Sequence, residues 1–318
     1  MSLDLDRPFD NITNFRDVGR TINTIAGRKI LKEGVFFRSA RLDEASEKDI
    51  RRLTEDLHVS TVIDLRSTTE HQMAIEKHKR RHNIPTGSSD FQPQDERGYI
   101  HLPSLDDTET STRRHLISLT GKGFERQLLW RLDWWNFTKV LAYIAAGYRQ
   151  DAVRIVGEHV MKPAGLTGLA IDTLEASKGE IKQIFDVLSS VDTDIATDSS
   201  TSASSNGFLI HCTQGKDRTG LIVLLSLLLT GVVDIEVIAS EYMLSEKELE
   251  NEPIEEKEER MKEIRAIGLE DEYARCPKDF TQRVSTFLNE KYGGVREYLA
   301  SVGVDEGALE SMRRRLLA

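Results

Sequence analysis

The residues best suited to chemistry lie in the stretch 207–231. Cys212 follows a short apolar run at 208–210, Arg218 lies six residues further on, and a second apolar run occupies 221–229. The first run predicts a buried strand and the second predicts a buried helix. A tight loop between a strand and a helix directs its backbone N–H groups and the helix N-terminus at one point, so we expect an anion-binding site there.

The side chains of this loop suit phosphoryl transfer. The field of the loop favours the thiolate of Cys212, which is the nucleophilic form of cysteine. The planar guanidinium of Arg218 can hold two phosphoryl oxygens, and Lys216 adds positive charge where the transferred group spreads its negative charge. Cys212 would attack phosphorus in line and form a phosphocysteine, which water then hydrolyses. The alternative is a structural loop, in which Cys212 is inert and the two cations only cap the helix.

The order of residues in this loop resembles a known signature. His211-Cys212-x-x-Gly215-x-x-Arg218, followed by Thr and Gly, resembles the signature of the cysteine-dependent protein tyrosine and dual-specificity phosphatases. The inner run Gly-Lys-Asp-Arg is more narrowly similar to the bacterial and fungal tyrosine/serine phosphatase family, whose members can also act on phosphoinositides. The resemblance implies catalytic roles for Cys212 and Arg218. It also implies that the rest of the loop binds the substrate through Thr213, Gln214, Gly215, Lys216, Thr219 and Gly220.

Asp217 is the first candidate for a general acid. The departing oxygen of phosphotyrosine, whose parent phenol has a pKa of about 10, needs a proton, and a positioned carboxylic acid can supply it. Asp217 lies inside the loop, and an Asp directly before the Arg is similar to the arrangement in myotubularin-type lipid phosphatases. The alternative role of Asp217 is to cap the following helix, where a carboxylate is favourable. Further candidates lie in the polar segment 83–122, namely Asp90, Asp95, Asp106 and Asp107.

The composition limits the class of protein. The chain of 318 residues is 39% hydrophobic, enough for a sizeable core. It has no apolar run near the roughly 20 residues that span a bilayer. The net charge of −10 argues against nucleic acid and against general adhesion to an anionic membrane. The N-terminus lacks the basic and apolar regions of a signal peptide, and two cysteines, Cys212 and Cys276, cannot form a disulfide framework. We therefore expect a reducing, cytoplasmic setting and no stable membrane insertion.

The sequence contains no cofactor motif and no cluster of metal ligands. His71, His78 and His82 are close in sequence, but they lie on a charged predicted helix without a framework at zinc spacing. We expect each of them to be exposed to solvent. The predicted reaction therefore needs neither a metal nor a cofactor.

The order of predicted elements indicates an α/β fold. We expect a central, mostly parallel sheet with helices on both faces, similar to the protein tyrosine phosphatases. A strand pair is predicted near 29–31 and 35–38, and a strand rich in β-branched residues at 61–66. Ser46 with Asp49, and Ser67 with Glu70, are capping pairs that predict two helix starts.

Two stretches outside the loop also resemble the phosphatase family. They are the entry segment 14–19 and the run Asp64-Leu65-Arg66-Ser67. Arg16 and Asp17 could support the site from behind or form only a structural turn. Asp64 and Arg66 lie at the carboxyl end of a predicted strand, where sites of α/β proteins gather, but a structural ion pair explains them equally well.

We expect a single phosphatase domain over residues 1–318, completed by a helical C-terminal cap. Within this domain, we expect residues 82–190 to form a helical insertion or cap. The segment 191–207 is rich in Ser, Thr and Asp, which predicts a flexible surface loop. The catalytic strand, loop and helix occupy 208–231. The charged stretch 245–276 is typical of a helix face exposed to solvent. The alternative is that this stretch forms a lid over the pocket.

Three tryptophans cluster in the predicted insertion. Trp130, Trp134 and Trp135 lie on a helical pattern over 128–148. Aromatic residues at that spacing usually form core, and we expect the segment to cover the sheet. A platform for the substrate is the alternative.

The sequence thus predicts a phosphate monoester hydrolase that acts through a phosphocysteine. Phosphotyrosine-bearing protein is the first substrate expected, with dual specificity included, and phosphoinositide is the close alternative. A rhodanese-like sulfurtransferase also uses a Cys loop on an α/β sheet, and a phosphate-binding module without catalysis is a third possibility. The Arg-Thr-Gly sequence and the apolar helix after the loop favour the phosphatase.

Overall fold

The computed structural model describes residues 9–81, 112–190, 207–250, 252 and 254–318. Five strands form one sheet in the order β1-β2-β5-β3-β4. The strands are β1 (Arg16–Asp17), β2 (Phe36–Ser39), β3 (Val59–Asp64), β4 (Arg113–Leu116) and β5 (Gly207–His211). Only β1 pairs antiparallel, and β5 lies between β2 and β3 in parallel register. The mostly parallel sheet that the sequence predicts is therefore confirmed.

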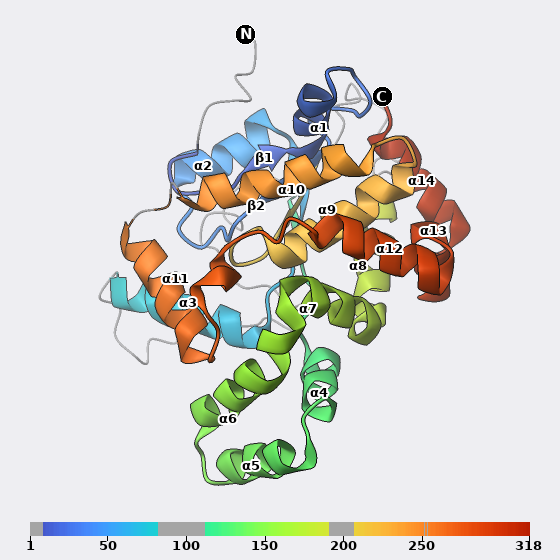
Figure 1. The fold of residues 1–318 in the computed structure, drawn as a ribbon. Coiled ribbons are helices and arrows are strands. Elements are labelled where there is room, and N and C mark those ends of the chain that lie inside the picture. Colours follow the sequence, from blue (N-terminus) through green and yellow to red (C-terminus); the bar gives the residue numbers. More distant parts are fainter. Residues whose placement is uncertain (1–8, 82–111, 191–206, 251, 253) are drawn as a thin grey trace.

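Helices surround this sheet (Figure 1). The first group is α1 (Val18–Ala26), α2 (Glu47–Arg51), α3 (Thr68–Arg81), α4 (Lys122–Trp130), α5 (Trp134–Ala145), α6 (Arg149–Val156) and α7 (Lys162–Ala176). The second group is α8 (Lys178–Ser190), α9 (Asp217–Thr230), α10 (Ile235–Glu250), α11 (Ile254–Ala266), α12 (Phe280–Tyr292), α13 (Val295–Ser301) and α14 (Glu306–Leu316). Short helical turns cover Arg52–Asp56, Gly157–Met161 and Asp271–Ala274.

Alternation along the strands puts apolar side chains on both faces of the sheet. Phe208 and Ile210 of β5 pack into the larger cluster, with α8, α9 and the C-terminal helices, whereas Leu209 packs into the cluster beneath α2. Both faces are thus covered by helices, as expected for a buried parallel sheet. The helix α9 is apolar on nearly every side and almost wholly buried, so it fixes the loop in front of it rigidly.

The helix starts predicted from the capping pairs are confirmed. Ser46 accepts from the N–H of Asp49, and the Asp49 carboxylate accepts from the N–H of Ser46 in return. The Glu70 carboxylate likewise accepts from the N–H of Ser67 at 2.9 Å, and the Ser67 hydroxyl accepts from the N–H of Glu70 at 3.3 Å.

The strand predicted at 29–31 is wrong. Leu31 forms only an isolated bridge to Leu317 near the C-terminus, and the partner of β2 is the short strand β1. Leu31 is buried because it packs into the core beneath α1, so its apolar character reflects packing and not strand pairing. The segment 82–190, predicted as helical, also contains β4, an edge strand whose charged sequence carries no strand pattern.

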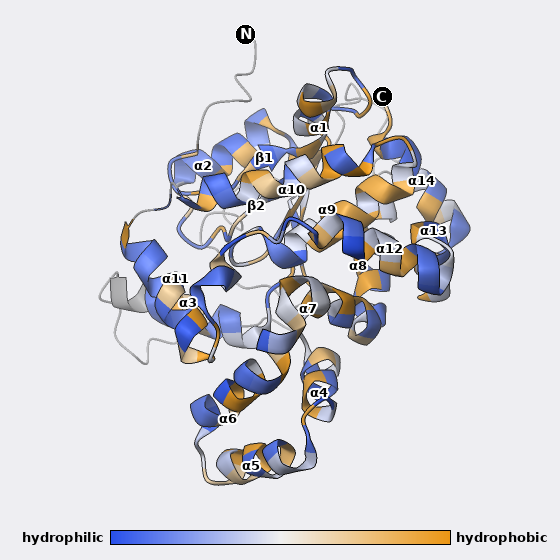
Figure 2. Ribbon diagram, viewed as in Figure 1, coloured by the Kyte–Doolittle hydropathy of each residue, from blue (hydrophilic) through white to orange (hydrophobic). Residues whose placement is uncertain are grey.

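The tryptophans do not form core. Trp130, Trp134 and Trp135 are 77%, 78% and 68% exposed, and α4, α5 and α6 project from the body of the molecule instead of covering the sheet (Figures 1 and 2). A small separate cluster holds these helices together; among others it contains Phe124, Leu128, Val140 and Ala152. The tryptophans lie outside that cluster because α5 buries only Asn136 and Val140.

Candidate active site

The loop 212–218 lies at the carboxyl end of the central strand β5. Cys212 follows the last residue of that strand, and α9 begins at Asp217, so the helix N-terminus points back at the loop. Gly215 has φ 64°, and a Cβ there would lie 2.2 Å from the carbonyl oxygen of Ser39. Only glycine fits this turn, which explains its place three residues after the cysteine.

Side chains from the first 40 residues hold the outside of the loop. The Asn14 amide donates to the carbonyl of Gln214 at 2.9 Å, and Arg38 donates to the carbonyl of Gly215 at 2.6 Å. Arg38 is fully buried and is paired with Glu241 of α10 at 2.7 Å. Arg16 binds the other oxygen of Glu241 at 2.7 Å, so the entry segment supports the loop indirectly.

The carbonyl groups of the loop are thus bound from outside while its N–H groups are available. Within the described part of the chain, the backbone N–H groups of Thr213, Gln214 and Gly215 donate to no other group. Donors that converge without a partner suit a bound oxyanion.

Arg218 is held by Glu70 at the start of α3. Its Nη1 donates to Oε2 of Glu70 at 2.7 Å, and Nη2 donates to Oε1 at 2.5 Å. Burial opposes the charge of Arg218, but the Glu70 carboxylate raises its pKa, and the charges of Cys212 and Asp217 act in the same direction. Burial similarly opposes the charge of Glu70, yet Arg218 holds its pKa well below the usual range.

Glu70 also binds the loop itself, because its Oε1 accepts a hydrogen bond from the hydroxyl of Thr213. One carboxylate therefore fixes both the first loop residue after the cysteine and the arginine at the end of the loop. The sequence pattern indicates only a capping role for Glu70. Its second role depends on β3 and β5 being neighbours, which a capping pattern does not reveal.

A buried network of charges lies behind Cys212. Asp64 is fully buried and accepts from Arg66 at 2.9 Å and from Arg114 of β4 at 2.5 Å. The Nε2 of His211 lies 3.5 Å from Asp64 Oδ2. Burial, helped by the charges of Arg66 and Arg114, lowers the pKa of His211 to about 4, so this imidazole is neutral near pH 7. Asp64 and Arg66 thus form a buried ion pair.

His71 is not exposed to solvent, so the prediction for this residue is wrong. It is buried, and its Nε2 lies 3.8 Å from Asp64 Oδ2 at the edge of this network. Burial, with the charges of Arg66 and Arg114, lowers its pKa. No group of side chains suited to holding a metal occurs among the described residues.

Asp217 is the first residue of α9 and is half-buried. The Tyr242 hydroxyl donates to its Oδ1 at 3.3 Å, and the Lys216 ammonium lies 3.7 Å from its Oδ2. The other predicted acids, Asp90, Asp95, Asp106 and Asp107, lie outside the described residues.

Lys216 points away from the centre of the loop. Its side chain is fully buried, and its ammonium donates to the carbonyls of Tyr273 and Arg275 at 2.9 and 2.8 Å. It therefore ties the loop to the segment that follows α11. Thr219 and Gly220 are buried in the first turn of α9, where a Cβ on Gly220 would lie 2.9 Å from the ring of Tyr242.

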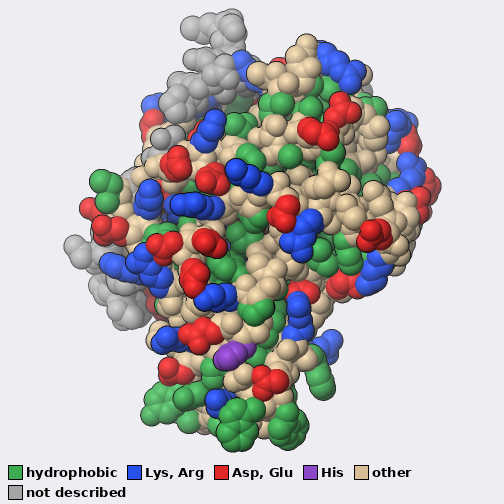
Figure 3. All heavy atoms as spheres, viewed as in Figure 1, with side chains coloured by type: hydrophobic (Ala, Val, Ile, Leu, Met, Phe, Trp, Pro, Cys, Tyr) green, Lys and Arg blue, Asp and Glu red, His purple; other side chains and the backbone are tan. Residues whose placement is uncertain are grey.

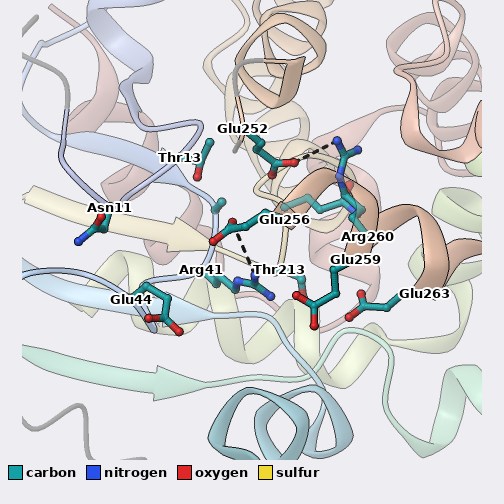
Figure 4. A pocket seen from close by; sticks show the side chains of 12 residues that line it. Asn11, Thr13, Arg41, Glu44, Thr213, Glu252, Glu256, Glu259, Arg260 and Glu263 are labelled. Carbon is teal, nitrogen blue, oxygen red and sulfur yellow. Dashed lines mark ion pairs between the residues drawn. The ribbon is translucent and has the colours of Figure 1, made fainter. Parts of the chain in front are cut away.

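A cavity of about 40 Å³ opens beside the loop, with room for a few water molecules. It is lined by Thr213 and Gln214 of the loop and by Glu252 and residues of α11 (Figure 4). Five glutamates and two arginines line this space; they are Glu44, Glu252, Glu256, Glu259, Glu263, Arg41 and Arg260. Burial, with the charge of Glu259 adding to it, raises the pKa of Glu263.

Ion pairs fix α11 over this cavity. Arg41 lies 3.8 Å from Glu256, Arg260 lies 3.0 Å from Glu252, and Lys77 of α3 lies 2.5 Å from Glu259. The charged stretch 245–276 thus lies beside the loop, in the form of the end of α10, then α11 and the turn Asp271–Ala274.

The sheet, the loop that begins at Cys212 and the buried helix behind it define an α/β fold of the protein tyrosine phosphatase type. The sequence model of the tyrosine phosphatase family matches residues 7–318. The chain belongs to this family, which confirms the resemblance seen in the loop.

One curated relative is a tyrosine-protein phosphatase from Nostoc commune. It is 34% identical over 113 residues, an alignment that covers 34% of this chain and 38% of the relative. The chain thus matches well under half of that protein's length. Among the described residues, no helix is long and apolar enough to cross a membrane.

Proposed function

We propose that this chain hydrolyses phosphate monoesters through a phosphocysteine at Cys212, and that protein phosphotyrosine is its main substrate. The observation that carries the proposal is the placement of Cys212 and Arg218 on one loop whose first N–H groups have no other partner in the described chain. Family membership supports the same reaction class and favours it over a sulfurtransferase or a non-catalytic module.

In the proposed reaction the Cys212 thiolate attacks phosphorus and the ester P–O bond breaks. Asp217 gives its proton to the departing oxygen, and Arg218 with the loop N–H groups stabilises the transferred group. Water then attacks the phosphocysteine, Asp217 takes a proton from that water, and inorganic phosphate leaves with the thiolate restored. The net reaction consumes one water and needs no metal.

The charge around the cavity supports phosphotyrosine over phosphoinositide. Five glutamates against two arginines line the space next to the loop, so a headgroup with additional phosphates would meet net negative charge there. Lys216, which could have attracted a further phosphate, is occupied by two carbonyl groups.

The helix α11 would act as a lid in this proposal. Arg41 and Lys77 hold α11 beside the loop through ion pairs, and these pairs would break if α11 moves to admit the substrate. Because these pairs are partly exposed, raising the ionic strength should lower KM modestly.

A rate comparison tests the proposal. Phosphotyrosine peptides, phosphoserine or phosphothreonine peptides and phosphoinositide would be assayed in parallel with a chelator present. The proposal expects the phosphotyrosine peptide to have the highest kcat/KM and the chelator to have no effect. A faster rate on phosphoinositide would make the lipid the main substrate. If none of these substrates releases phosphate, the proposed phosphatase activity is wrong.

A further inference from the structure

All three tryptophans of the chain lie on the projecting helices α4 and α5, and all three are more than two-thirds exposed. They belong to a surface that we call the aromatic tip, which consists of Trp130, Trp134, Trp135, Leu141, Ile144 and Tyr148. In Figure 3 apolar side chains gather at this end of the molecule. Tryptophan is normally mostly buried, so a cluster of exposed ones indicates a binding surface.

The fold itself does not use this surface. Every residue from Leu141 to Tyr148 is exposed, and none of them is charged. The inward contacts of α5 come from Asn136, Val140 and the partly buried Phe137, so replacing Trp134 and Trp135 would leave the small cluster beneath them intact. The apolar side of α5 is therefore available to a partner outside the chain.

The charge of the tip indicates which partner. Residues 122–156, from the start of α4 to the end of α6, contain six Lys or Arg and three Asp or Glu, a net charge of +3 in a chain of −10. Two of these cations, Arg131 and Arg154, pair with Asp172 and Glu158 outside this range, so the excess of positive charge falls to +1 when these partners are included. Lys139 of α5 lies beside the tip, with its ammonium 5.7 Å from the centre of the Trp135 ring. Interfacial tryptophans and tyrosines beside cations are the combination that binds the headgroup region of an anionic bilayer.

A second copy of the chain fits this surface poorly. A two-fold dimer would place the same patch on both partners, so two tips of net positive charge would face each other. On the face seen in Figure 3, the tip also projects as a convex end.

We propose that the aromatic tip binds the surface of an anionic lipid bilayer, with Trp134 and Trp135 inserted among the headgroups. Because α5 would lie in the interface, no spanning helix is needed. Docking there would also hold the loop near the surface. The Tyr273 hydroxyl donates to the carbonyl of Met161 at the base of the tip at 2.5 Å, and the Tyr273 carbonyl accepts from Lys216 of the loop.

The tryptophans provide the test, because intrinsic fluorescence reports on the tip alone. The full chain would be titrated with vesicles of phosphatidylcholine, with and without phosphatidylserine. We expect a blue shift of the emission, quenching by lipids brominated on the acyl chains, and co-sedimentation with the phosphatidylserine vesicles. Salt should weaken this binding, since part of it is electrostatic.

Variants separate the tip from the rest of the surface. Replacing both anchors (Trp134→Ala with Trp135→Ala) should lower the partition coefficient about tenfold or more, with Trp130 left as the reporter. Lys139→Glu should lower it on phosphatidylserine vesicles only. Ile25→Ser, which alters an exposed apolar residue of α1 that is 37% exposed, is the matched control and should bind as the parent does.

Three results would overturn the inference: no spectral shift with either vesicle, an equal loss of binding in Ile25→Ser, or a shift that rises with protein concentration without lipid. The last would assign the tip to self-association. Far-ultraviolet circular dichroism and thermal unfolding would verify that each variant folds. Since none of these measurements needs turnover, failure of the proposed enzyme activity would not be confused with failure of membrane binding.

Discussion

Glu70 and Arg218 form a two-point ion pair, 2.7 and 2.5 Å long, that joins the start of α3 to the end of the loop. Glu70 reaches this position because β3 lies beside β5 and both strands end at the same edge of the sheet. The pair leaves Nε of Arg218 without a partner among the described residues. Glu70 would thus orient the guanidinium toward a phosphoryl group without occupying all of its donors.

Removing Glu70 should misplace this guanidinium. We expect Glu70→Ala to lower kcat/KM on an aryl phosphate by up to about 10²-fold, because small errors in position are costly in catalysis. Glu70→Gln, which keeps one acceptor, should recover part of the loss. Ser67→Ala removes the capping partner alone and is the control; if it costs as much as Glu70→Ala, the effect of Glu70 is on the helix and not on Arg218.

Cys212→Ser should abolish turnover and preserve phosphate binding, because the loop N–H groups and Arg218 remain. Steady-state rates and isothermal titration with inorganic phosphate would measure the two effects. The other cysteine is a natural control, since burial raises the pKa of Cys276 to about 11 and keeps it protonated near neutral pH. Hydrolysis by Cys212→Ser near the parent rate would exclude the covalent intermediate.

Arg218→Lys should also be severe, about 10²–10³-fold in kcat, because a point charge cannot replace a planar fork. Lysine also cannot satisfy both oxygens of Glu70 and a phosphoryl group together. Rates on an aryl phosphate would measure the loss, and a KM change with unaltered kcat would instead indicate a role in ground-state binding alone.

Substrates with different leaving groups distinguish a catalytic role of Asp217 from a structural one. If Asp217 is the general acid, Asp217→Asn should cost roughly 10²–10⁴-fold with phosphotyrosine and much less with an activated aryl phosphate. Tyr242→Phe removes only the 3.3 Å hydrogen bond to this carboxylate and should cost far less. Similar small losses on both substrates would leave Asp217 with a structural role and direct the search to Asp106 and Asp107.

Asp17 should make stability depend on pH. It caps α1 and accepts from the N–H of Gly34 at 2.6 Å, but burial raises its pKa to about 6. A carboxyl whose pKa is raised in the fold stabilises most below its unfolded pKa of about 4 and loses that contribution as the pH rises through 6.

The loss should amount to about 2–3 kcal/mol between pH 4 and 7. Urea unfolding of the parent and of Asp17→Asn at several pH values in this range would measure the loss. The two proteins should differ in the slope of the free energy of unfolding against pH. A hydrogen bond lost in the variant at every pH shifts its curve but does not change this slope. Parallel curves for the two proteins would mean that the fold does not raise the pKa of Asp17.

The chemistry of the loop was readable from sequence because it is local. The residues from Cys212 to Arg218 are consecutive in sequence, and their spacing follows from the geometry of a strand, a loop and a helix N-terminus. Phe208 to Ile210 and the apolar stretch of α9 were equally predictable, since full burial leaves Ser226 as the one polar residue in either.

The supports of the loop were not readable because they come from distant segments. Asn14, Arg38 and Glu70 contact the loop, and Glu241 contacts Arg38. The partners in these four contacts are separated by 148 to 203 residues. The tryptophans were misassigned for a different reason. A helix that is apolar on its outer side has the same spacing as one buried in a core, so periodicity cannot tell which partner covers it.

The position of β5 has a consequence for how the chain is made. The strand fills the middle of the sheet, yet it follows β1, β2, β3 and β4 in sequence. During synthesis β2 and β3 therefore leave the ribosome with no neighbour between them, each with a hydrogen-bonding edge open. Nascent chains that end before residue 207 should be prone to aggregate through those edges, and release of β5 is the step that closes them.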